Sequence, residues 1–260
     1  MGILNVTPDS FYDGGQFEGV ERALERARAM AREGADIIDI GGESTGPGSG
    51  EVSIGEELRR VIPTLKSIKY QVVSIKLSVD TYKAEVARAA LDAGAEMIND
   101  VTAGRGDRGM FALMAEMGCD YVMMRSKDDS PRTTKKDVQY DDVVKTIHEF
   151  FEERISQAEK AGVKREKIIL DPGLGHFVSS DPKYSFEILE RLEEISDLGC
   201  RILVSPSRKS FTAGPTNLPP EKRLENTLAA TKLAIEHGAS MIRTHDVKET
   251  KKLIRQMNLV

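Results

Sequence analysis

The 260-residue chain is poor in several residue types that mark particular protein classes. It has no tryptophan and only two cysteines, Cys119 and Cys200, which form neither a CxxC pair nor a disulfide framework. Two lone thiols are most simply buried apolar groups, and this usage suits a reducing cytoplasm. The sequence contains no P-loop, H-E-x-x-H or G-x-S-x-G pattern. Its four histidines lack metal-ligand spacing, so no structural zinc is expected.

Long apolar runs and a strong charge of one sign are also lacking. No apolar stretch approaches the ~18 residues that a membrane-spanning helix needs, and the opening MGILNV lacks the basic segment of a secretion signal. Lys and Arg number 37 against 42 Asp and Glu, which gives a net charge of -5 with no basic block. These features argue against membrane and nucleic-acid partners and leave small molecules as the expected partners.

The chain does contain a recurring junction, in which a glycine and one or two small or polar residues precede a short apolar run. It occurs as EGADIIDI (33–40), AGAEMIND (93–100), MGCDYVMM (117–124), LGCRILVS (198–205) and HGASMIRT (237–244). Such a junction predicts a helix that ends on a glycine with positive φ and leads directly into a buried strand. Apolar residues at helical spacing fill the segments between the junctions.

These patterns predict eight strands, each followed by a helix. The strands are expected near residues 2–5, 36–40, 75–79, 95–99, 120–124, 167–171, 201–205 and 240–244. Eight such units with no domain-sized gap favour an α/β fold, a single (β/α)8 TIM barrel over residues 1–260, with a doubly wound open sheet as the rival. In a barrel the strand C-termini meet at one mouth, where active sites lie.

Polar residues stand where most of these strands end. Any one of them alone is explained as a cap or a turn residue, but so many at one mouth are better explained by a ligand. Asp80, Asn99 and Asp171 suit a flat, donor-rich heterocycle such as a pterin. The donors near the last two strands suit the oxygens of a phosphate or pyrophosphate. They are Arg208, Lys209, Arg243 and His245.

Longer motifs make the chain resemble dihydropteroate synthase. They are, in order, GILNVTPDSFYDGG, GADIIDIGGEST, SVDTYK, AGAEMINDV, DPGLG, SRKSF and RTHDV, and they extend over essentially the whole chain. The resemblance implies a transferase of folate biosynthesis that condenses p-aminobenzoate with 6-hydroxymethyl-7,8-dihydropterin pyrophosphate, giving 7,8-dihydropteroate and pyrophosphate. It also implies a sulfonamide target, a Mg²⁺ cofactor, a cytoplasmic location and a homodimer formed through late helices.

The resemblance assigns roles to residues of this chain as well. The pterin would be held by Asp80, Asn99, Asp171 and Lys209. The pyrophosphate would be held by Asn5, Thr45, Arg243 and His245, with Asn5 also near Mg²⁺. Ser210 and the loops containing Phe11 and Pro47 would border the aminobenzoate. The expected catalytic residues are Asp80, Lys209, Arg243 and His245. Residues about 7–16 are expected to form a mobile lid.

Three stretches depart from the family's usual pattern. ESTGPG has Gly46 where an arginine is usual, and DPGLGHFV has His176 and Val178 where a phenylalanine and a lysine are common. YVMMRSKDD lacks the usual MHM. The first two departures lie on the aminobenzoate and anion side, so the use of aminobenzoate and sensitivity to sulfonamides stay open.

Two other functions stay open from the sequence. A pterin-binding methyltransferase of the corrinoid type would hold methyltetrahydrofolate at the same acceptors, but it needs no pyrophosphate site, and the SRKS and RTHD cations argue against it. A non-catalytic pterin- or phosphate-binding protein is the second alternative, kept open by Gly46 and Val178. Release of pyrophosphate from a pterin pyrophosphate separates the first, and product formation with aminobenzoate separates the second.

Overall fold

The computed structural model describes residues 1–7, 16–72 and 74–258. All eight predicted strands are present, with ends within two residues of those expected. The strands are β1 (Gly2–Asn5), β2 (Ile37–Gly41), β3 (Lys76–Asp80), β4 (Met97–Asp100), β5 (Asp120–Met124), β6 (Ile168–Asp171), β7 (Arg201–Val204) and β8 (Met241–Ile242). The helices are α1 (Gln16–Glu33), α2 (Ile54–Gln71), α3 (Ala84–Asp92), α4 (Met110–Met117), α5 (Val143–Lys160), α6 (Pro182–Glu190), α7 (Leu192–Ser196), α8 (Leu224–Glu236) and α9 (Val247–Gln256). Four 3₁₀ turns complete the described elements: η2 (Arg165–Lys167), η3 (Gly175–Phe177), η4 (Ser210–Ala213) and η5 (Pro220–Lys222).

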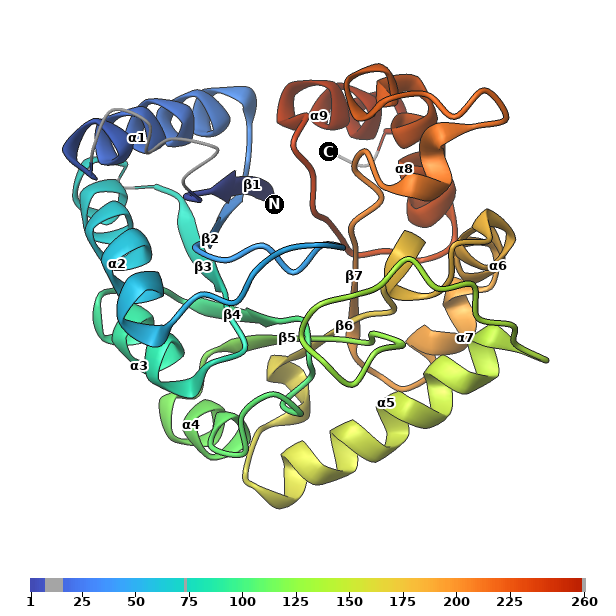
Figure 1. Ribbon diagram of the computed structural model, residues 1–260, viewed down its shortest axis with the longest axis horizontal. Helices are drawn as coiled ribbons and strands as arrows, with labels where there is room; N and C mark the ends of the chain where they lie inside the picture. Colours follow the sequence, from blue (N-terminus) through green and yellow to red (C-terminus); the bar gives the residue numbers. More distant parts are fainter. Residues whose placement is uncertain (8–15, 73, 259–260) are drawn as a thin grey trace.

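The strands pair in chain order from β1 to β8, and every pair is parallel. They curl around a common centre with the helices outside (Figure 1). Between β8 and β1 the described residues form one isolated bridge, from Gly2 to Thr244, instead of a ladder. The expected α/β barrel is therefore confirmed in strand number, order and direction, and the β1–β8 seam is its least paired part.

The glycine junctions behave as the sequence predicts. The glycines that follow α1, α3, α4, α7 and α8 all have positive φ, between 61° and 105°. They are Gly34, Gly94, Gly118, Gly199 and Gly238. Because this conformation is strained for residues with a Cβ, a glycine one to three residues past the end of each helix lets the chain turn into the next strand. Short helix-to-strand connections of this kind leave the longer loops to the opposite end of the barrel.

Alternation along each strand decides which side chains enter the barrel. On β2, Ile38 and Ile40 pack in the large core between strands and helices, whereas Ile37 belongs to a separate apolar cluster. That cluster draws on several strands and fills the lower interior; it contains Met1, Ile37, Met97, Val122, Ile169 and Leu203. Because side chains alternate with a period of two, Asp39 and Asn99 stand one step above this apolar plug, nearer the mouth.

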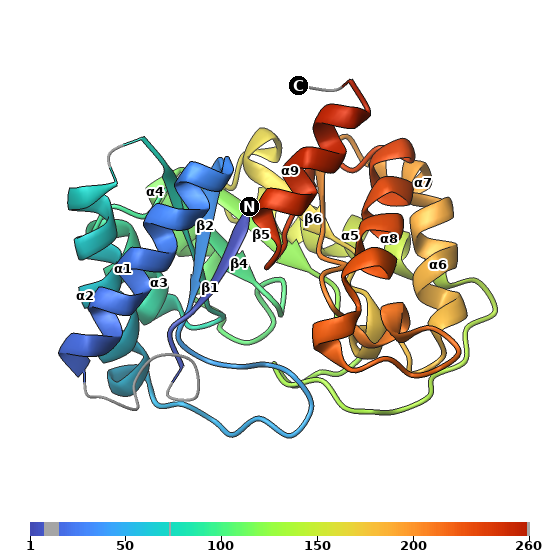
Figure 2. The ribbon, with the colours of Figure 1, turned by 90° about the horizontal axis from the view of Figure 1, so that it is seen from above.

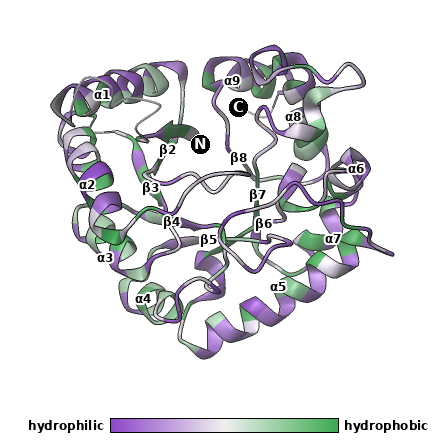
Figure 3. Ribbon diagram, in the orientation of Figure 1, coloured by the Kyte–Doolittle hydropathy of each residue, from purple (hydrophilic) through white to green (hydrophobic). Residues whose placement is uncertain are grey.

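The helices are apolar on the face that packs against the strands. In Figure 3 helix α5 alternates between hydrophobic and hydrophilic residues along its length, as a half-buried helix does. Its buried residues include Ile147, Phe151 and Ile155. Among the described residues, no helix is both long enough and apolar enough to cross a membrane. Cys119 and Cys200 are half-buried, so the sequence placed them somewhat too deep.

Long loops gather at the carboxyl ends of the strands. The β2 loop (residues 42–53) and the β5 loop (residues 125–142) run along the same side of the barrel, at the lower edge of Figure 2. The β6 loop (residues 172–181) and the β7 loop (residues 205–223) border the same mouth. The expected lid around Phe11 falls on residues 8–15, which lie outside the described residues.

Candidate active site

A charged cluster occupies the mouth just above the apolar plug. Arg243, directly after β8, donates from Nε to Asp39 Oδ2 at 2.6 Å and from Nη2 to Asp80 Oδ2 at 2.8 Å. Asn99 on β4 donates from Nδ2 to the same Asp39 oxygen at 3.0 Å. The arginine thus ties β8 to β2 and β3 through its fork of donors, a geometry suited to carboxylates.

Asp39 was not among the site residues that the sequence predicted. It is fully buried, and its Oδ1 is one of the few buried side-chain oxygens without a hydrogen-bond partner among the described residues. Its signal in the sequence is a carboxylate in the middle of the apolar run IIDI, where a buried strand would normally be apolar. A buried acceptor left open in this way has capacity for a donor from a ligand.

Burial shifts the protonation of the charges in this cluster. Desolvation raises the pKa of Asp80 to about 7 against the opposing pull of Arg243, with Asp39 adding repulsion. Desolvation disfavours the charge on Arg243, but Asp39 and Asp80 outweigh it and leave the pKa of Arg243 raised. The mouth therefore holds a permanent cation beside a carboxyl group that titrates near neutrality.

A second pair of charges lies across the mouth. Asp171, at the end of β6, is 3% exposed, and burial raises its pKa while the Gly173 N–H donates to Oδ1 at 2.9 Å. Lys209 from the β7 loop forms no ion pair with the described carboxylates; instead its Nζ lies 5.0 Å from the centroid of the Phe177 ring. Desolvation lowers the pKa of Lys209 to about 8, although the attraction of Asp171 opposes this.

His245 is placed beside the arginine but is held as a neutral ring. Its Nδ1 lies 3.0 Å from Ser207 Oγ, and its backbone N–H donates to the same hydroxyl at 3.1 Å. Desolvation of the ring, with Arg243 nearby, lowers the pKa of His245 to about 4, so at neutral pH it carries no charge. It can donate one hydrogen bond to an anion, as a neutral donor rather than as a cation.

Arg208 corrects another expectation from the sequence. Its guanidinium donates to both Asp246 oxygens, at 2.9 Å and 2.6 Å, and its backbone has a φ of 55°. The side chain is therefore committed to the start of α9 rather than available to a ligand. The Arg208–Asp246 pair thus holds the β7 loop against the start of α9, which fixes the backbone that carries Lys209.

The other predicted residues lie around the rim. Asn5 ends β1, is exposed, and pairs in register with Gly41, which in turn pairs with Asp80. Thr45 is half-buried in the β2 loop, where its C=O accepts from the Thr133 N–H at 3.1 Å. Ser210 is half-buried at the start of η4. Among the described residues, no hydrogen bond joins the side chains of Thr45 or Ser210 to the Arg243 cluster.

An ion network joins the loops above the mouth, and the sequence did not predict it. Lys83 Nζ bonds Glu43 Oε2 at 2.5 Å, Glu57 Oε2 at 2.6 Å and the Val52 C=O at 2.6 Å. Arg132 from the β5 loop also contacts Glu43, although its own Nε is buried without a partner. Two anions thus balance two cations and fix the β2 and β5 loops to α2 and to the start of α3.

The described residues do not build a dedicated metal centre, because no group of three or more His, Cys, Asp or Glu side chains gathers to hold an ion. Asn5 nevertheless presents an amide side chain at the rim. Mg²⁺ is commonly bound by few protein oxygens together with water and substrate phosphates. The described residues would therefore fit a Mg²⁺ only if a phosphate substrate supplied most of its ligands, and the expected role of Asn5 as a protein ligand is a prediction.

Comparisons with known proteins converge on one family. A family model described as pterin binding enzyme matches residues 1–245. The dihydropteroate synthase of Escherichia coli strain K12 is 42% identical over 255 residues, covering 98% of this chain and 89% of that protein. A probable bifunctional folylpolyglutamate synthase/dihydropteroate synthase of Haloferax volcanii is 47% identical over 249 residues, covering 96% of this chain but only 29% of that protein.

A solved structure gives the same result for the fold. The dihydropteroate synthase of Xanthomonas albilineans, solved with 4-aminobenzoic acid, superposes with a TM-score of 0.90 at 42% sequence identity. The match covers 100% of this chain and 92% of that one. The similarity therefore extends over the barrel as a whole and includes the mouth in which the charged cluster lies.

Proposed function

The chain belongs to the pterin-binding enzyme family, and we propose that it is a dihydropteroate synthase. It condenses p-aminobenzoate with 6-hydroxymethyl-7,8-dihydropterin pyrophosphate, giving 7,8-dihydropteroate and pyrophosphate. The observation that carries this proposal is the pairing, in one mouth, of acceptors with cationic donors. The acceptors are the buried Asn99 and Asp171 and the half-buried Asp80, and the donors are Arg243 and Lys209. A methyltransferase needs the first set but not the second.

The acceptors suit the pterin end of the substrate. An amino-pyrimidinone edge is rich in N–H donors, and the carboxylate and amide oxygens of Asp80 on β3, Asn99 on β4 and Asp171 on β6 can accept from it. Asp171 is held in place by the Gly173 N–H, and Asp80 by Arg243. The Lys209 ammonium can donate a hydrogen bond to the carbonyl oxygen or to a ring nitrogen of the pterin. This division of roles among the residues is part of the proposal.

The cations suit the leaving group. Arg243 uses Nε and Nη2 for Asp39 and Asp80, and no hydrogen bond among the described residues uses its Nη1, which remains available to pyrophosphate oxygens. Neutral His245 adds one N–H. Donors fixed before the reaction stabilise charge that develops in the transition state without reorganising.

The reaction needs no protein nucleophile. As the methylene C–O bond breaks, its electron pair leaves with pyrophosphate, and the ionised carboxylates of Asp80 and Asp171 stabilise positive charge on the pterin. The aniline nitrogen then forms the new C–N bond and loses a proton to solvent. Mg²⁺, bound through the pyrophosphate and Asn5, would supply further neutralisation of the leaving charge. The loops around the mouth limit the access of competing water.

The test is a steady-state assay with pterin pyrophosphate, aminobenzoate and Mg²⁺ that follows pyrophosphate and dihydropteroate together. We expect equal amounts of both products, and competition between sulfonamides and aminobenzoate. Release of no pyrophosphate would favour a binding protein, and methyl transfer from methyltetrahydrofolate would favour the methyltransferase. Near-normal turnover in both Asp80→Ala and Lys209→Ala would contradict the proposed site.

We also propose a closed single-domain barrel that acts as a homodimer in the cytoplasm. Closure is supported by two bonds at the seam, Ile3 N–H to Thr244 C=O and Thr244 N–H to Met1 C=O, both 3.0 Å. For the dimer, we choose the exposed apolar side chain nearest the late helices: Phe186 on α6 is 39% exposed beside a cleft of about 760 Å³ shared with α8. Among the described residues, α8 and α9 expose no large apolar side chain. Light scattering of the wild type and of Phe186→Asp tests this.

A further inference from the structure

Lys127, in the β5 loop, has a saturated and buried ammonium group. Its side chain is 3% exposed, and Nζ lies close to four acceptors. These are Asp128 Oδ2 at 2.8 Å, Thr133 Oγ1 at 3.0 Å, the Thr134 C=O at 2.7 Å and the His176 C=O at 2.5 Å. A buried lysine with this many partners holds several segments in one geometry. We call Lys127, Asp128, Thr133 and the His176 carbonyl the β5–β6 clasp.

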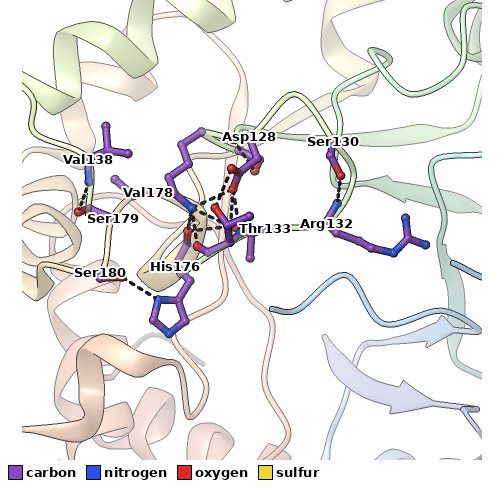
Figure 4. Close-up of polar contacts among 12 residues, drawn as sticks. Asp128, Ser130, Arg132, Thr133, Val138, His176, Val178, Ser179 and Ser180 are labelled. Atoms are coloured by element: carbon purple, nitrogen blue, oxygen red, sulfur yellow. Dashed lines mark hydrogen bonds and ion pairs between the residues drawn. The ribbon is translucent and has the colours of Figure 1, made fainter. Parts of the chain in front are cut away.

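The anion of the clasp is equally well held. Asp128 accepts from Lys127, from the Thr133 hydroxyl at 2.9 Å, and from the Thr134 N–H and hydroxyl at 3.0 Å and 2.9 Å. Burial opposes its ionisation, but these hydrogen bonds outweigh it and lower the pKa of Asp128 to about 2. Figure 4 shows the contacts converging on Asp128, Thr133 and His176. The Asp128 carboxylate therefore stays ionised throughout the neutral range.

The clasp attaches the β5 loop to the β6 loop by backbone as well. The Lys127 N–H donates to the Phe177 C=O at 2.8 Å, and the Arg125 N–H donates to the Asp171 C=O at 2.9 Å. The chains approach so closely that a Cβ on Gly173, which has a φ of 70°, would lie 2.3 Å from the Arg125 carbonyl oxygen. Lys127 therefore fixes His176 through its side chain and Phe177 through its backbone.

Phe177 connects the β5–β6 clasp to the mouth of the barrel. Its ring packs against the buried cluster of Tyr82, Val101 and Met124, and it lies beneath the Lys209 ammonium at 5.0 Å. Because Lys209 has no ion pair with a described carboxylate, the aromatic face is the contact that defines where its charge lies. Removing the clasp would let Phe177 shift and would let water reach Lys209.

We propose that Lys127 is a positioning residue of the pterin end, which acts on Lys209 through Phe177. This inference rests on the proposed function. It assigns a task to the RSKDD stretch, one of the places where the chain departs from the family's usual pattern. Lys127 does not touch the substrate. It keeps the Phe177 ring in place, so the Lys209 ammonium is correctly positioned before the pterin binds.

The experiment is a double-mutant cycle between Lys127→Met and Phe177→Leu, measured as kcat/KM for pterin pyrophosphate across pH. We expect Lys127→Met to lower kcat/KM by about tenfold, and the double variant to lose no more than Phe177→Leu alone, because both act on one support. The fall of kcat/KM above pH 8, where Lys209 loses its proton, should move to higher pH in both single variants.

Lys135→Met is the matched control, since it removes the same charge from an exposed side chain of the same loop. It should leave the rate and the pH profile unchanged. If Lys127→Met does not fold, Thr133→Val removes the hydroxyl that lies 3.0 Å from Lys127 Nζ and 2.7 Å from the His176 carbonyl oxygen, while keeping the ion pair. It should give a smaller shift in the same direction.

Additive losses with an unmoved pH profile, or an effect of Lys127→Met on thermal stability alone, would overturn the inference. An inactive wild type is a different outcome, because it contradicts the proposed function. In that case binding of the pterin pyrophosphate, followed by calorimetry in the same variants, still tests whether Lys127 and Phe177 act as one unit.

Discussion

The interior of the mouth and the collar of loops above it hold their charges differently. In the interior, Arg243 has a free Nη1 and Asp39 Oδ1 has no partner among the described residues. In the collar, Lys83 and Lys127 each have at least as many acceptors as they have protons. Arg132 Nε is the exception among the described collar residues, because it is buried without a hydrogen-bond partner. Unused hydrogen-bonding capacity is available to a ligand, whereas saturated capacity maintains a shape.

The largest effect is expected for Arg243→Met. It removes the cation that faces the leaving group and leaves Asp39 buried without a counter-charge. We expect kcat/KM to fall by about 10³-fold and the free energy of unfolding to fall by about 3 kcal/mol, measured by steady-state kinetics and denaturant titration. Arg191→Met, which removes the ion pairs with Asp142, Glu187 and Glu194 on the outer surface, is the control and should change neither value greatly. A mild phenotype in Arg243→Met would contradict the interior assignment.

Asp80→Asn should separate activity from stability. We expect a loss of about 10²-fold in kcat/KM, because a neutral amide cannot stabilise positive charge on the pterin. Since the folded pKa of Asp80 is raised from 3.8 to about 7, its carboxyl contributes stability below pH 4 that is lost as pH rises through 7. Unfolding measured between pH 4 and 8 should therefore show a decline in the wild type that is shallower in Asp80→Asn. An unchanged slope would show that Asp80 does not titrate there.

The interior is the part of the site that sequence patterns could predict. Asp80 and Asp171 end β3 and β6, and Asn99 is the last residue but one of β4, so the shared mouth places them together without knowledge of any long-range contact. Asp39 was missing from the predicted site residues because it lies in the middle of β2 rather than at its end. The sequence left open whether His245 serves as a neutral donor or as a cation, because desolvation and the proximity of Arg243, which lower its pKa, cannot be read from RTHD alone.

The collar could not be predicted from the sequence. Its bonds join residues 40, 89 and 49 positions apart: Lys83 to Glu43, Arg132 to Glu43, and Lys127 to the His176 carbonyl. Irregular loops have no periodicity from which such contact partners could be predicted. A lysine in a polar stretch is usually solvated, so its sequence gives no sign of burial. Their pairing depends on how the barrel brings the loops together, which only the folded chain shows.

Lys83→Met, in the collar, should lower the stability of the fold more than the catalytic rate, the reverse of what we expect for Asp80→Asn in the interior. It leaves the carboxylates of Glu43 and Glu57, 3% and 1% exposed, without their shared cation. We expect the free energy of unfolding to fall by about 3 kcal/mol, while kcat in the folded fraction stays within about threefold because no interior donor is lost. Replacing both carboxylates as well, in Lys83→Met with Glu43→Gln and Glu57→Gln, should recover part of the stability. A large fall in kcat with unchanged stability would place Lys83 in the chemistry instead.

The smallest expected effect concerns Gly46, where the family usually has an arginine. The nearest atom to a Cβ at Gly46 would be Ser44 Oγ at an ordinary 3.7 Å, and its φ is not positive, so Gly46→Arg should fold without strain. If the loop lies at the anion side, the added cation should lower KM for pterin pyrophosphate by about threefold at low salt and lose this gain at high salt. Gly48→Arg is the matched control: it has open space but a φ of 84°, so it should cost about 1 kcal/mol of stability with little effect on KM. A salt-independent change, or a higher KM in Gly46→Arg, would contradict this role for an arginine at position 46. It would mean that the interior cations alone neutralise the charge of the leaving group.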